Sequence, residues 1–514
     1  MAATRLEHPT TEGPLVEPLD EHNRTLLSNV HPPDWVNPQP ADRYNLVVIG
    51  AGTAGLVTAA GAAGLGAKVA LVERHLMGGD CLNVGCVPSK CVIRSSRVVA
   101  ELRDAARFGI HAGAVAVDFP AVMARMRRLR AHISAHDSAA RFHDLGVDVF
   151  LGEGRFTGPD TVVVGGATLR FRRAVVATGA RAAHPPIPGL AEAGFLTNET
   201  VFSLTERPRS LAVIGAGPIG CELAQAFRRL GSEVVLFHDF PHVLNREDAD
   251  AAEIVQRAFV REAIRLVLDA RLTRVTTGAG GKTIAFEAGG AAATVSVDEI
   301  LVGAGRVPNV DGLGLESVGV AHDRERGVHV DDRLQTTNPR IYAAGDVCMS
   351  TKFTHAADAA ARVVIQNALF LGRKRLSALT IPWCTYTDPE IAHVGMYERD
   401  AAARGIPVTT FVVPLADVDR AVADGEEEGF VKVHVRAGGD AILGATIVAR
   451  HAGEMLNELT LAIVRKIGLG ALASIVHPYP TQAEAIRKAG DAYNRTRLTP
   501  LVKRAFAAWL RWRR

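Results

Sequence analysis

Two cysteines five positions apart are the residues of this chain that are best suited to redox chemistry. Cys81 and Cys86 lie in the segment 78–90, whose sequence is GGDCLNVGCVPSK. Two cysteines at this spacing at the start of a helix can close a short disulfide, and a helix N-terminus favours the thiolate form of each. Two buried thiols or half of a zinc site would give the same pattern, but no second cysteine pair stands at zinc-ligand spacing. The spacing therefore indicates thiol chemistry and disfavours zinc.

A glycine-rich turn precedes the cysteines. Gly50, Gly52 and Gly55 follow the apolar run 46–49 and open a segment of small residues. The first glycine permits a tight turn, the second lets the backbone approach a pyrophosphate, and the third lets helix and strand pack closely. The next apolar strand ends in Glu73, an acid placed to accept ribose hydroxyls. This pattern predicts a dinucleotide site, the alternative being a tight turn without a ligand.

A second turn of the same kind lies in the middle of the chain and contains Gly215, Gly217 and Gly220. Two such units suggest two dinucleotides, the arrangement that a flavin needs if it takes hydride from a nicotinamide. The strand after this turn ends in His238 and Asp239. An acid there favours NAD and an arginine favours the 2′-phosphate of NADP, so the choice between NADH and NADPH stays open.

The bulk composition is that of a globular protein of two to four domains, because 514 residues exceed one ordinary core. The formal net charge of +3 gives no electrostatic case for nucleic acid. Six cysteines are few for a disulfide scaffold, and the first residues show no apolar leader, so we expect a cytoplasmic protein.

Strands that alternate with helical segments predict an α/β class with parallel sheets. The run 46–72 carries only Lys68 as a charge and resembles a membrane span in hydropathy. We interpret it instead as a buried strand, a packed helix and a second buried strand, because glycines interrupt it at the spacing of a nucleotide-binding turn.

The cysteine segment resembles the pyridine nucleotide-disulfide oxidoreductases, the family of glutathione reductase, lipoamide dehydrogenase and mercuric reductase. The string CLNVGCVPSK over residues 81–90 is highly specific to that family, and the resemblance extends from residue 44 to about 495. Other positions that fit the family pattern are Thr178 and Gly179 in an Ala-Thr-Gly turn, Arg306 at a strand exit, Asp346 in a second flavin motif, and Glu222 in the helix after the second glycine turn.

The resemblance implies a redox-active disulfide between Cys81 and Cys86, with FAD and either NADPH or NADH as cofactors. Cys86 would contact the flavin and form the charge-transfer thiolate, and Cys81 would be the outer thiol that attacks substrate. Lys90 would pair with Glu222 beside the flavin, and Asp346 would bind the ribityl chain. Electrons would pass from the nicotinamide through the flavin to the disulfide.

The resemblance also predicts the domain organisation: two Rossmann-like dinucleotide-binding domains, for FAD and NAD(P), and a C-terminal α+β dimerisation domain. The predicted segments are an N-terminal arm (1–43), the first part of the FAD-binding domain (44–190), the NAD(P)-binding domain (191–309), the second part of the FAD-binding domain (310–379), the dimerisation domain (380–495) and a basic aromatic tail (496–514). We expect the arm to lie on the surface or against a partner.

In this family the active site is shared across a homodimer, and one subunit's C-terminal end supplies an acid–base group to the disulfide of the other. The usual string is His-Pro-Thr-x-x-Glu. Anchoring it on Pro480, Thr481 and Glu484 places Tyr479 where the histidine normally stands, with His477 two residues earlier. Tyrosine at this place is the mercuric reductase pattern, in which it helps to hold the metal ion.

We therefore expect an enzyme that reduces Hg(II) or a related thiophilic acceptor, with Cys81, Cys86 and Tyr479 as transient ligands of the substrate ion. The chain departs from mercuric reductase in ending without a vicinal cysteine pair. An NAD(P)H-linked disulfide reductase or a dihydrolipoamide dehydrogenase-like enzyme is the alternative, disfavoured because a phenol is a poor base near neutral pH. A non-enzymatic flavoprotein, a redox sensor or scaffold, is a third hypothesis. The basic tail either packs against the dimer or attaches weakly to an anionic membrane.

Overall fold

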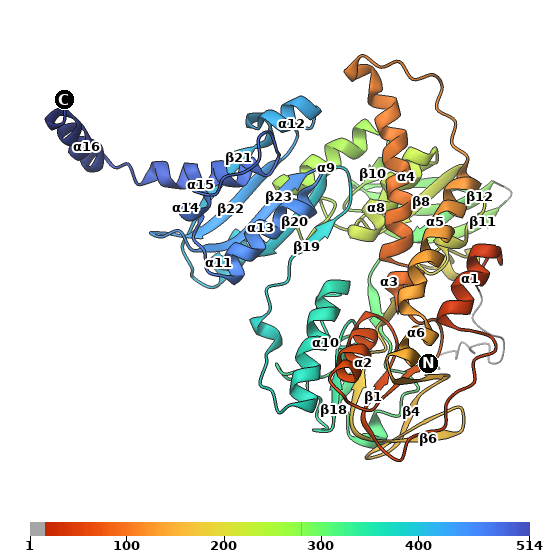
Figure 1. The fold of residues 1–514 in the computed structure, drawn as a ribbon. Coiled ribbons are helices and arrows are strands. Elements are labelled where there is room, and N and C mark those ends of the chain that lie inside the picture. Colours follow the sequence, from red (N-terminus) through yellow and green to blue (C-terminus); the bar gives the residue numbers. More distant parts are fainter. Residues whose placement is uncertain (1–15, 279) are drawn as a thin grey trace. The chain divides into compact units, whose positions relative to one another are not determined.

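The structure is a computed structural model that describes residues 16–278 and 280–514 (Figure 1). Its internal contacts divide the chain into two compact units. The first unit lies within Met1–Pro186, Phe195–Pro208 and Leu301–Leu379, and the second comprises Ile187–Gly194, Arg209–Ile300 and Thr380–Arg514. The first unit contains the predicted FAD motifs and both candidate cysteines, and the second contains the other glycine turn and the C-terminal region.

The first unit is built on a sheet of order β3-β2-β1-β6-β5-β4, with β18 also paired to β6. Its strands are β1 (Tyr44–Ile49), β2 (Val69–Glu73), β3 (Val147–Leu151), β4 (Arg155–Gly158), β5 (Thr161–Val164), β6 (Ala167–Val176) and β18 (Ile341–Ala343). The β1 strand pairs in parallel with β2 and β6, whereas β5 pairs with β6 antiparallel. Parallel strands covered on both faces are apolar along their length, which explains the composition of β1 and β2.

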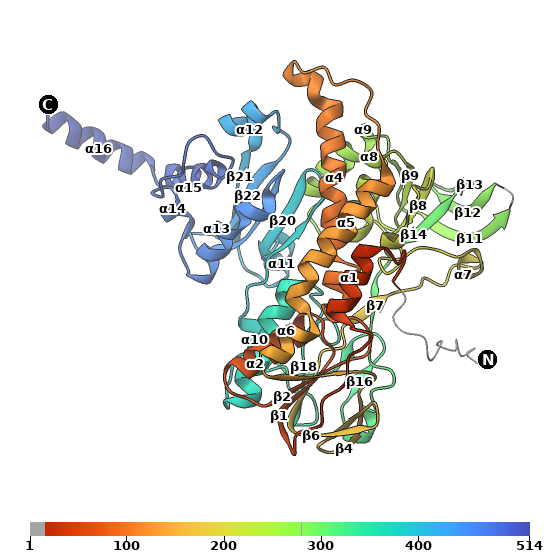
Figure 2. The ribbon, with the colours of Figure 1, turned by 45° about the vertical axis from the view of Figure 1, so that its right-hand side comes forward.

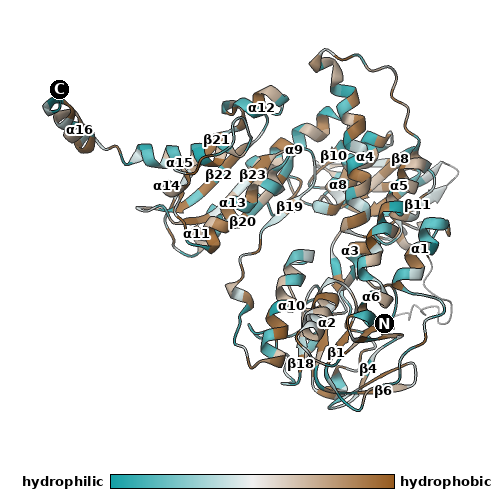
Figure 3. Ribbon diagram, in the orientation of Figure 1, coloured by the Kyte–Doolittle hydropathy of each residue, from teal (hydrophilic) through white to brown (hydrophobic). Residues whose placement is uncertain are grey.

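The apolar run 46–72 consists of β1, the helix α2 (Thr53–Gly64) and β2, as predicted. The α10 helix (Thr354–Leu369) packs on α2. Among the residues that the structure describes, no helix is long and apolar enough to cross a membrane. Figure 3 shows hydrophobic residues in β1 and β8, the strands that precede the two glycine turns.

Helices between β2 and β3 carry the cysteines. They are α3 (Gly79–Asn83), α4 (Cys86–Asp104), α5 (Phe119–Ser134) and α6 (Ala139–Asp144). Residues 109–118, between α4 and α5, contain no α-helix. The α4 and α5 helices lie side by side in both views (Figures 1 and 2).

The N-terminal arm is packed more closely than a surface arm would be. Its helix α1 (Glu21–Val30) lies against α5, with Asn23, Leu26 and Val30 buried. After the helix, the Asn37 amide donates to the carbonyl of Leu151 at 3.0 Å and accepts its N–H at 2.8 Å. The arm, from residue 16 onward, therefore belongs to the core of the first unit, while residues 1–15 lie outside the described part.

The second unit begins with the strand–turn–helix–strand predicted around the second glycine turn: β8 (Ser210–Ile214), α8 (Pro218–Leu230) and β9 (Glu233–Phe237). The parallel sheet has the order β10-β9-β8-β14, and β11, β12 and β13 form a separate antiparallel sheet. The bounds are α9 (Ala249–Arg261), β10 (Arg265–Val267), β11 (Arg271–Gly278), β12 (Gly281–Ala288), β13 (Ala291–Val297) and β14 (Glu299–Val302).

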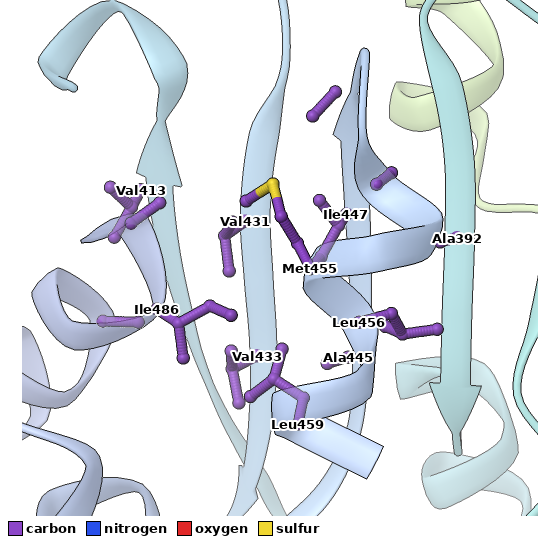
Figure 4. Close-up of a cluster of buried hydrophobic side chains, with 14 of the residues drawn as sticks. Ala392, Val413, Val431, Val433, Ala445, Ile447, Met455, Leu456, Leu459 and Ile486 are labelled. Atoms are coloured by element: carbon purple, nitrogen blue, oxygen red, sulfur yellow. The ribbon is translucent and has the colours of Figure 1, made fainter. Parts of the chain in front are cut away.

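The C-terminal part of the second unit is an antiparallel sheet of order β19-β20-β23-β22-β21. Its elements are β19 (Trp383–Thr385), β20 (Glu390–Gly395), β21 (Val408–Pro414), β22 (Phe430–Arg436), β23 (Ile442–Ala449), α13 (Ala452–Val464), α15 (Glu484–Thr496) and α16 (Pro500–Trp512). The sheet packs Val431 and Ile447 against Leu456 of α13 and Ile486 of α15 (Figure 4). The predicted α/β class, with two Rossmann-like folds and a C-terminal α+β domain, is confirmed.

Candidate functional site

The first glycine turn and the cysteine segment are in direct backbone contact. The N–H of Gly78 donates to the carbonyl of Ala51 at 2.8 Å. A Cβ atom on Gly79, whose φ is +56°, would lie 2.7 Å from the Cα of Gly52. Only glycine fits at this contact, because a side chain would separate the two segments. The local sequence therefore places Cys81, in α3, and Cys86, at the first position of α4, immediately beside the predicted dinucleotide turn.

The two thiols are not bonded to each other in this structure but share a hydrogen bond. The hydrogen bond to Cys86, burial, and the charge of the Cys86 sulfur together raise the pKa of Cys81. Cys86 lies 3.4 Å from the hydroxyl of Thr354, the first residue of α10. We expected a helix N-terminus to favour the thiolate of each cysteine. At Cys81 the hydrogen bond to Cys86 and burial act against this effect, because two adjacent sulfurs do not readily ionise together.

Glu73 stands at the end of β2, where the sequence predicted a ribose-binding acid. One carboxylate oxygen accepts the N–H of Ala51 at 2.6 Å, and the other accepts the N–H of His75 at 2.8 Å. Burial raises the pKa of Glu73. On the opposite side of the turn, a Cβ on Gly50 would come within 2.4 Å of the Ala177 carbonyl. The carboxylate and the turn are thus held in one rigid arrangement.

Arg306 connects the cysteine segment to the second predicted flavin motif. Its guanidinium contacts the carboxylate of Asp80, the residue before Cys81, and donates to the carbonyl of Ala180 at 2.6 Å. Its Nε lies 3.3 Å from an oxygen of Asp346. Burial raises the pKa of Asp346, although the charge of Arg306 acts in the opposite direction. Nothing in the sequence identifies Asp80 as a site residue, because its partner is 226 residues away along the chain.

Thr178 and Gly179 are held by the strand exit that contains Arg306. The Thr178 hydroxyl donates to the carbonyl of Asn309 at 2.7 Å, and the Asn309 amide donates back to the carbonyl of Thr178 at 2.9 Å. A Cβ on Gly179 would meet no protein atom within 4 Å. Bare backbone at this turn and at Gly52, between the carboxylates of Glu73 and Asp346, suits a dinucleotide with a pyrophosphate and hydroxyl groups, so these residues fit FAD.

A buried arginine that we did not predict forms a hydrogen bond with the backbone of the cysteine segment. Arg130 of α5 donates to the carbonyl of Asn83, which lies between the two cysteines, at 2.6 Å. Its other nitrogen donates to the side-chain oxygen of Asn23 in α1 at 2.7 Å. Burial lowers the pKa of Arg130 to about 10. The sequence signals only an arginine-rich helix here, and nothing in it identifies the residue that turns inward.

Lys90 and Glu222, the pair expected beside the flavin, belong to different units. Lys90 lies four positions after Cys86 in α4, so both are on one face of the helix. Glu222 is buried in α8 and accepts the N–H of Tyr386 at 2.9 Å within the second unit. Their pairing stays a prediction.

The second glycine turn repeats the geometry of the first with a different side chain at the strand end. A Cβ on Gly220 would lie 1.9 Å from the carbonyl of Gly215, and one on Gly217 would meet no atom within 4 Å. The N–H of Ala216 donates to Nδ1 of His238 at 3.4 Å, across the same 22-residue separation as the Ala51–Glu73 bond. Asp239 beside it is largely exposed.

His238 therefore occupies the place that Glu73 has in the first fold. Burial lowers the pKa of His238, so the ring is neutral near pH 7. Nδ1 lies 3.4 Å from the backbone nitrogen of Ala216 and 3.3 Å from a carboxylate oxygen of Asp239, so it can accept from the first or donate to the second. Nε2 of the same ring is buried and has no hydrogen-bond partner among the described residues. An imidazole, rather than the carboxylate of the first fold, thus stands at the end of the strand.

The C-terminal string presents Tyr479 rather than His477. The Tyr479 side chain is 71% exposed, and its hydroxyl donates to Asp419 at 3.0 Å, which raises the pKa of Tyr479. Both ring nitrogens of His477 face acceptors: Nε2 is 3.0 Å from Glu458, and Nδ1 is 3.1 Å from the carbonyl of Ile475. His477 is therefore engaged within its own unit.

Glu484, the other acid of this string, opens α15. One of its carboxylate oxygens accepts from Arg487 at 2.5 Å. The other is buried and has no hydrogen-bond partner within residues 16–278 and 280–514. Glu484 lies close enough to Tyr479 for its charge to contribute to the raised pKa of that phenol.

Comparison with known proteins gives a consistent result. Residues 44–361 match the pyridine nucleotide-disulphide oxidoreductase family, and residues 381–490 match the dimerisation domain of that family. A mercuric reductase of Lysinibacillus sphaericus is 33% identical over 454 residues, covering 88% of this chain and 83% of the relative. A dihydrolipoyl dehydrogenase of Cupriavidus necator is also 33% identical, covering 89% of this chain and 99% of the relative.

Two solved structures resemble the chain along most of its length. The HOCl-induced flavoprotein disulfide reductase RclA from Escherichia coli has a TM-score of 0.77 and 26% identity, covering 87% of this chain and 99% of RclA. LpdA from Mycobacterium tuberculosis has a TM-score of 0.79 and 30% identity, covering 88% of this chain and 100% of LpdA.

Proposed function

The chain belongs to the pyridine nucleotide-disulphide oxidoreductase family, and from this premise we propose that it reduces a thiophilic metal ion, Hg(II), at Cys81 and Cys86. It is an FAD-dependent oxidoreductase that uses NAD(P)H and has the dimerisation domain of a homodimer. The observation that carries the proposal is the pair of adjacent thiols together with an exposed tyrosine, rather than a histidine, in the C-terminal string.

The cofactor residues follow from the two glycine turns. Gly50, Gly52, Gly55, Thr178, Gly179, Glu73 and Asp346 would hold FAD, and Gly215, Gly217, Gly220, His238 and Asp239 would hold the nicotinamide dinucleotide. When bound, FAD passes electrons from the nicotinamide toward the cysteine pair. Arg306 keeps Asp80 and Asp346 in place, and Lys90 with Glu222 would set the charge beside the flavin.

The cysteine pair suits a soft metal ion. Thiolates are the preferred ligands of soft ions, and two sulfurs close enough to share a hydrogen bond can bind one ion together. Binding releases the two thiol protons, which return to sulfur when the reduced metal leaves. The net reaction is NAD(P)H + Hg²⁺ → NAD(P)⁺ + H⁺ + Hg⁰.

Tyr479 favours metal over dithiol chemistry. Oxidation of a dithiol needs a base that takes a proton near neutral pH, and the hydrogen bond to Asp419 raises the pKa of Tyr479 further from that range. His477, the other candidate base, already faces Glu458. We propose that Tyr479 adds an oxygen contact to the metal from the partner subunit. A solved Cu(II) complex of RclA makes Cu(II) a second ion worth testing.

The test is NADPH and NADH oxidation with Hg(II), Cu(II), oxidised glutathione and lipoamide as acceptors. We expect Tyr479→Phe to reduce Hg(II)-dependent turnover about ten-fold, the equivalent of roughly 1.4 kcal/mol, through loss of one ligand. Tyr493→Phe, in α15, is the matched control and should leave turnover unchanged. The proposal is wrong if the wild type shows no Hg(II)-dependent turnover, or if Cys81→Ser turns over Hg(II) as fast as the wild type. A disulfide would then be the proposed acceptor.

Free thiol gives a second test of the metal reading. Residues 485–514 contain no cysteine that could strip other thiols from the ion. Excess external thiol should therefore compete strongly, and the apparent affinity for Hg(II) should fall as thiol is raised. We place the enzyme in the cytoplasm, where thiols stay reduced.

A further inference from the structure

The C-terminal helix α16 is a separate amphipathic element. It runs from Pro500 to Trp512, with proline at its first position and the Thr499 hydroxyl accepting the N–H of Val502. Proline at the first position and threonine as the N-cap are strong helix-start signals, so the sequence itself specifies this helix. Thirteen residues give a length of about 20 Å.

Two kinds of side chain divide the surface of α16. At about 100° per residue, an arc of roughly 140° contains the apolar and aromatic side chains. These are Leu501, Val502, Ala505, Phe506, Trp509 and Trp512, whereas Leu510 lies about 40° beyond the arc. Lys503, Arg504, Arg511 and Arg514 occupy the opposite side. Figure 3 shows both hydrophobic and hydrophilic residues along this helix.

The apolar arc is uncovered in the second unit. Leu501 and Trp512 are each 76% exposed, and Trp509 is 54% exposed. Trp509 and Trp512 contact each other with ring centroids 5.1 Å apart. Within the described residues, no hydrogen bond or ion pair joins a side chain of α16 to another helix or strand, and both views show α16 beyond the end of α15 (Figures 1 and 2). Contiguous exposed apolar surface of this kind marks an interaction site.

The positive charge of the segment around α16 favours an anionic partner. Residues 497–514 contain six Lys and Arg and no Asp or Glu. Lys503 and Arg504 flank the two edges of the apolar arc, where long side chains can reach anionic headgroups while their stems stay in the apolar layer. Tryptophan is enriched at membrane–water interfaces. Arg513 is the one cation within the arc, and its guanidinium lies over the Trp509 ring.

We propose that α16 is an interfacial helix that docks the enzyme onto an anionic lipid surface. A helix of about 20 Å cannot span a hydrocarbon core of about 30 Å, but it can lie in the interface with its apolar arc buried. A homodimer carries two copies of α16, so the second contact is intramolecular and strengthens attachment. This inference is independent of the electron acceptor.

Flotation with lipid vesicles tests the proposal on the full-length holoenzyme. The probes are vesicles of phosphatidylcholine alone and of phosphatidylcholine with about 30% phosphatidylglycerol. We expect binding to the anionic vesicles only, and at least a ten-fold loss of binding in 0.5 M salt. A chain that ends at Leu498 should lose vesicle binding while its NAD(P)H oxidation rate in solution stays unchanged.

Two double variants separate charge from apolar contact. Arg504→Gln with Arg511→Gln and Trp509→Ser with Trp512→Ser should each reduce binding at least ten-fold. Arg404→Gln with Arg465→Gln, two exposed positions elsewhere in the second unit, removes the same charge and should leave binding intact. Equal binding by the truncated chain would overturn the proposal. The proposal would also be overturned if the wild type did not float and its dimer dissociated on removal of α16, because α16 would then pack against a second copy of the chain.

Discussion

Replacing Gly55 by alanine tests the idea that the first glycine turn is closed by direct contact between helix and backbone. A Cβ at this position would lie 1.8 Å from the carbonyl oxygen of Gly50 and 3.5 Å from a methyl group of Val48. Gly64 is the matched control, because it lies in the same helix, is exposed, and would place its Cβ with no atom within 4 Å. The two variants differ only in what the added methyl group meets.

The expected magnitude follows from these distances. Since real Cβ contacts essentially never fall below 3.0 Å, α2 and the turn must separate by at least about 1.2 Å (3.0 − 1.8). Where side chains can move aside, an added methyl group in a packed core costs about 1–3 kcal/mol. The cost of Gly55→Ala should be at least as large, because the obstructing atom belongs to the backbone. Loss of FAD binding removes about 2.7 kcal/mol more at a hundred-fold excess of cofactor over Kd.

A combined loss of about 4–6 kcal/mol corresponds to a fall in Tm of roughly 10 °C or more for a unit of this size. Gly64→Ala should instead leave Tm unchanged or raise it slightly, because alanine is the better helix residue by about 0.5–1 kcal/mol. The assay is thermal unfolding at fixed FAD concentration, together with the flavin absorbance retained after gel filtration. A Gly55→Ala protein that keeps its flavin and its Tm would refute the reasoning.

Further predictions concern the thiols, the nicotinamide choice and the arm. Cys86→Ser should abolish long-wavelength thiolate-to-flavin absorbance on two-electron reduction, whereas Cys81→Ser should show it without reductant; an unchanged band in the Cys86 variant would reverse the roles. His238→Glu should shift the ratio of kcat/KM for NADPH over NADH toward NADH at least ten-fold, because a carboxylate accepts the ribose hydroxyl and repels a 2′-phosphate; no shift would remove His238 from cofactor selection. Although partial burial acts in the other direction, hydrogen bonds from Asn23 and Arg127 hold the pKa of Asp20 below its usual value. The free energy that Asp20 contributes to folding is therefore present at neutral pH and is lost as pH falls through the lowered pKa. Asp20→Asn should cost about 1–2 kcal/mol of unfolding free energy at pH 7 and much less near pH 3, measured by denaturant unfolding. A cost that does not change with pH would contradict this.

Local sequence determined the elements that carry chemistry. Both glycine turns fold as predicted, because a turn with φ of +102° at Gly50 and +101° at Gly215 admits glycine almost alone. The cysteine string and the Pro-capped α16 are equally local. Each of these signals comes from residues near one another in the chain, so their geometry needs no distant partner.

Distant contacts were beyond the reach of the sequence. The arm, expected on the surface or against a partner, packs on α5, where Asn23 accepts a hydrogen bond from Arg130, 107 residues away. Asp80 acquired its role only through Arg306. The pKa of the Cys81 thiol likewise depends on its contact with Cys86 and on burial, which the sequence alone does not show.

The sequence by itself thus determined which chemistry this chain can perform, since the type and spacing of Cys81 and Cys86 and of the glycines limit the backbone and the reactive groups locally. Tertiary structure decided which of these groups is poised to act. It turned His477 toward Glu458, left Tyr479 exposed, and placed His238 where the first fold has an acid. Proton affinity and exposure depend on neighbours that packing brings together, and those neighbours are far apart in the chain.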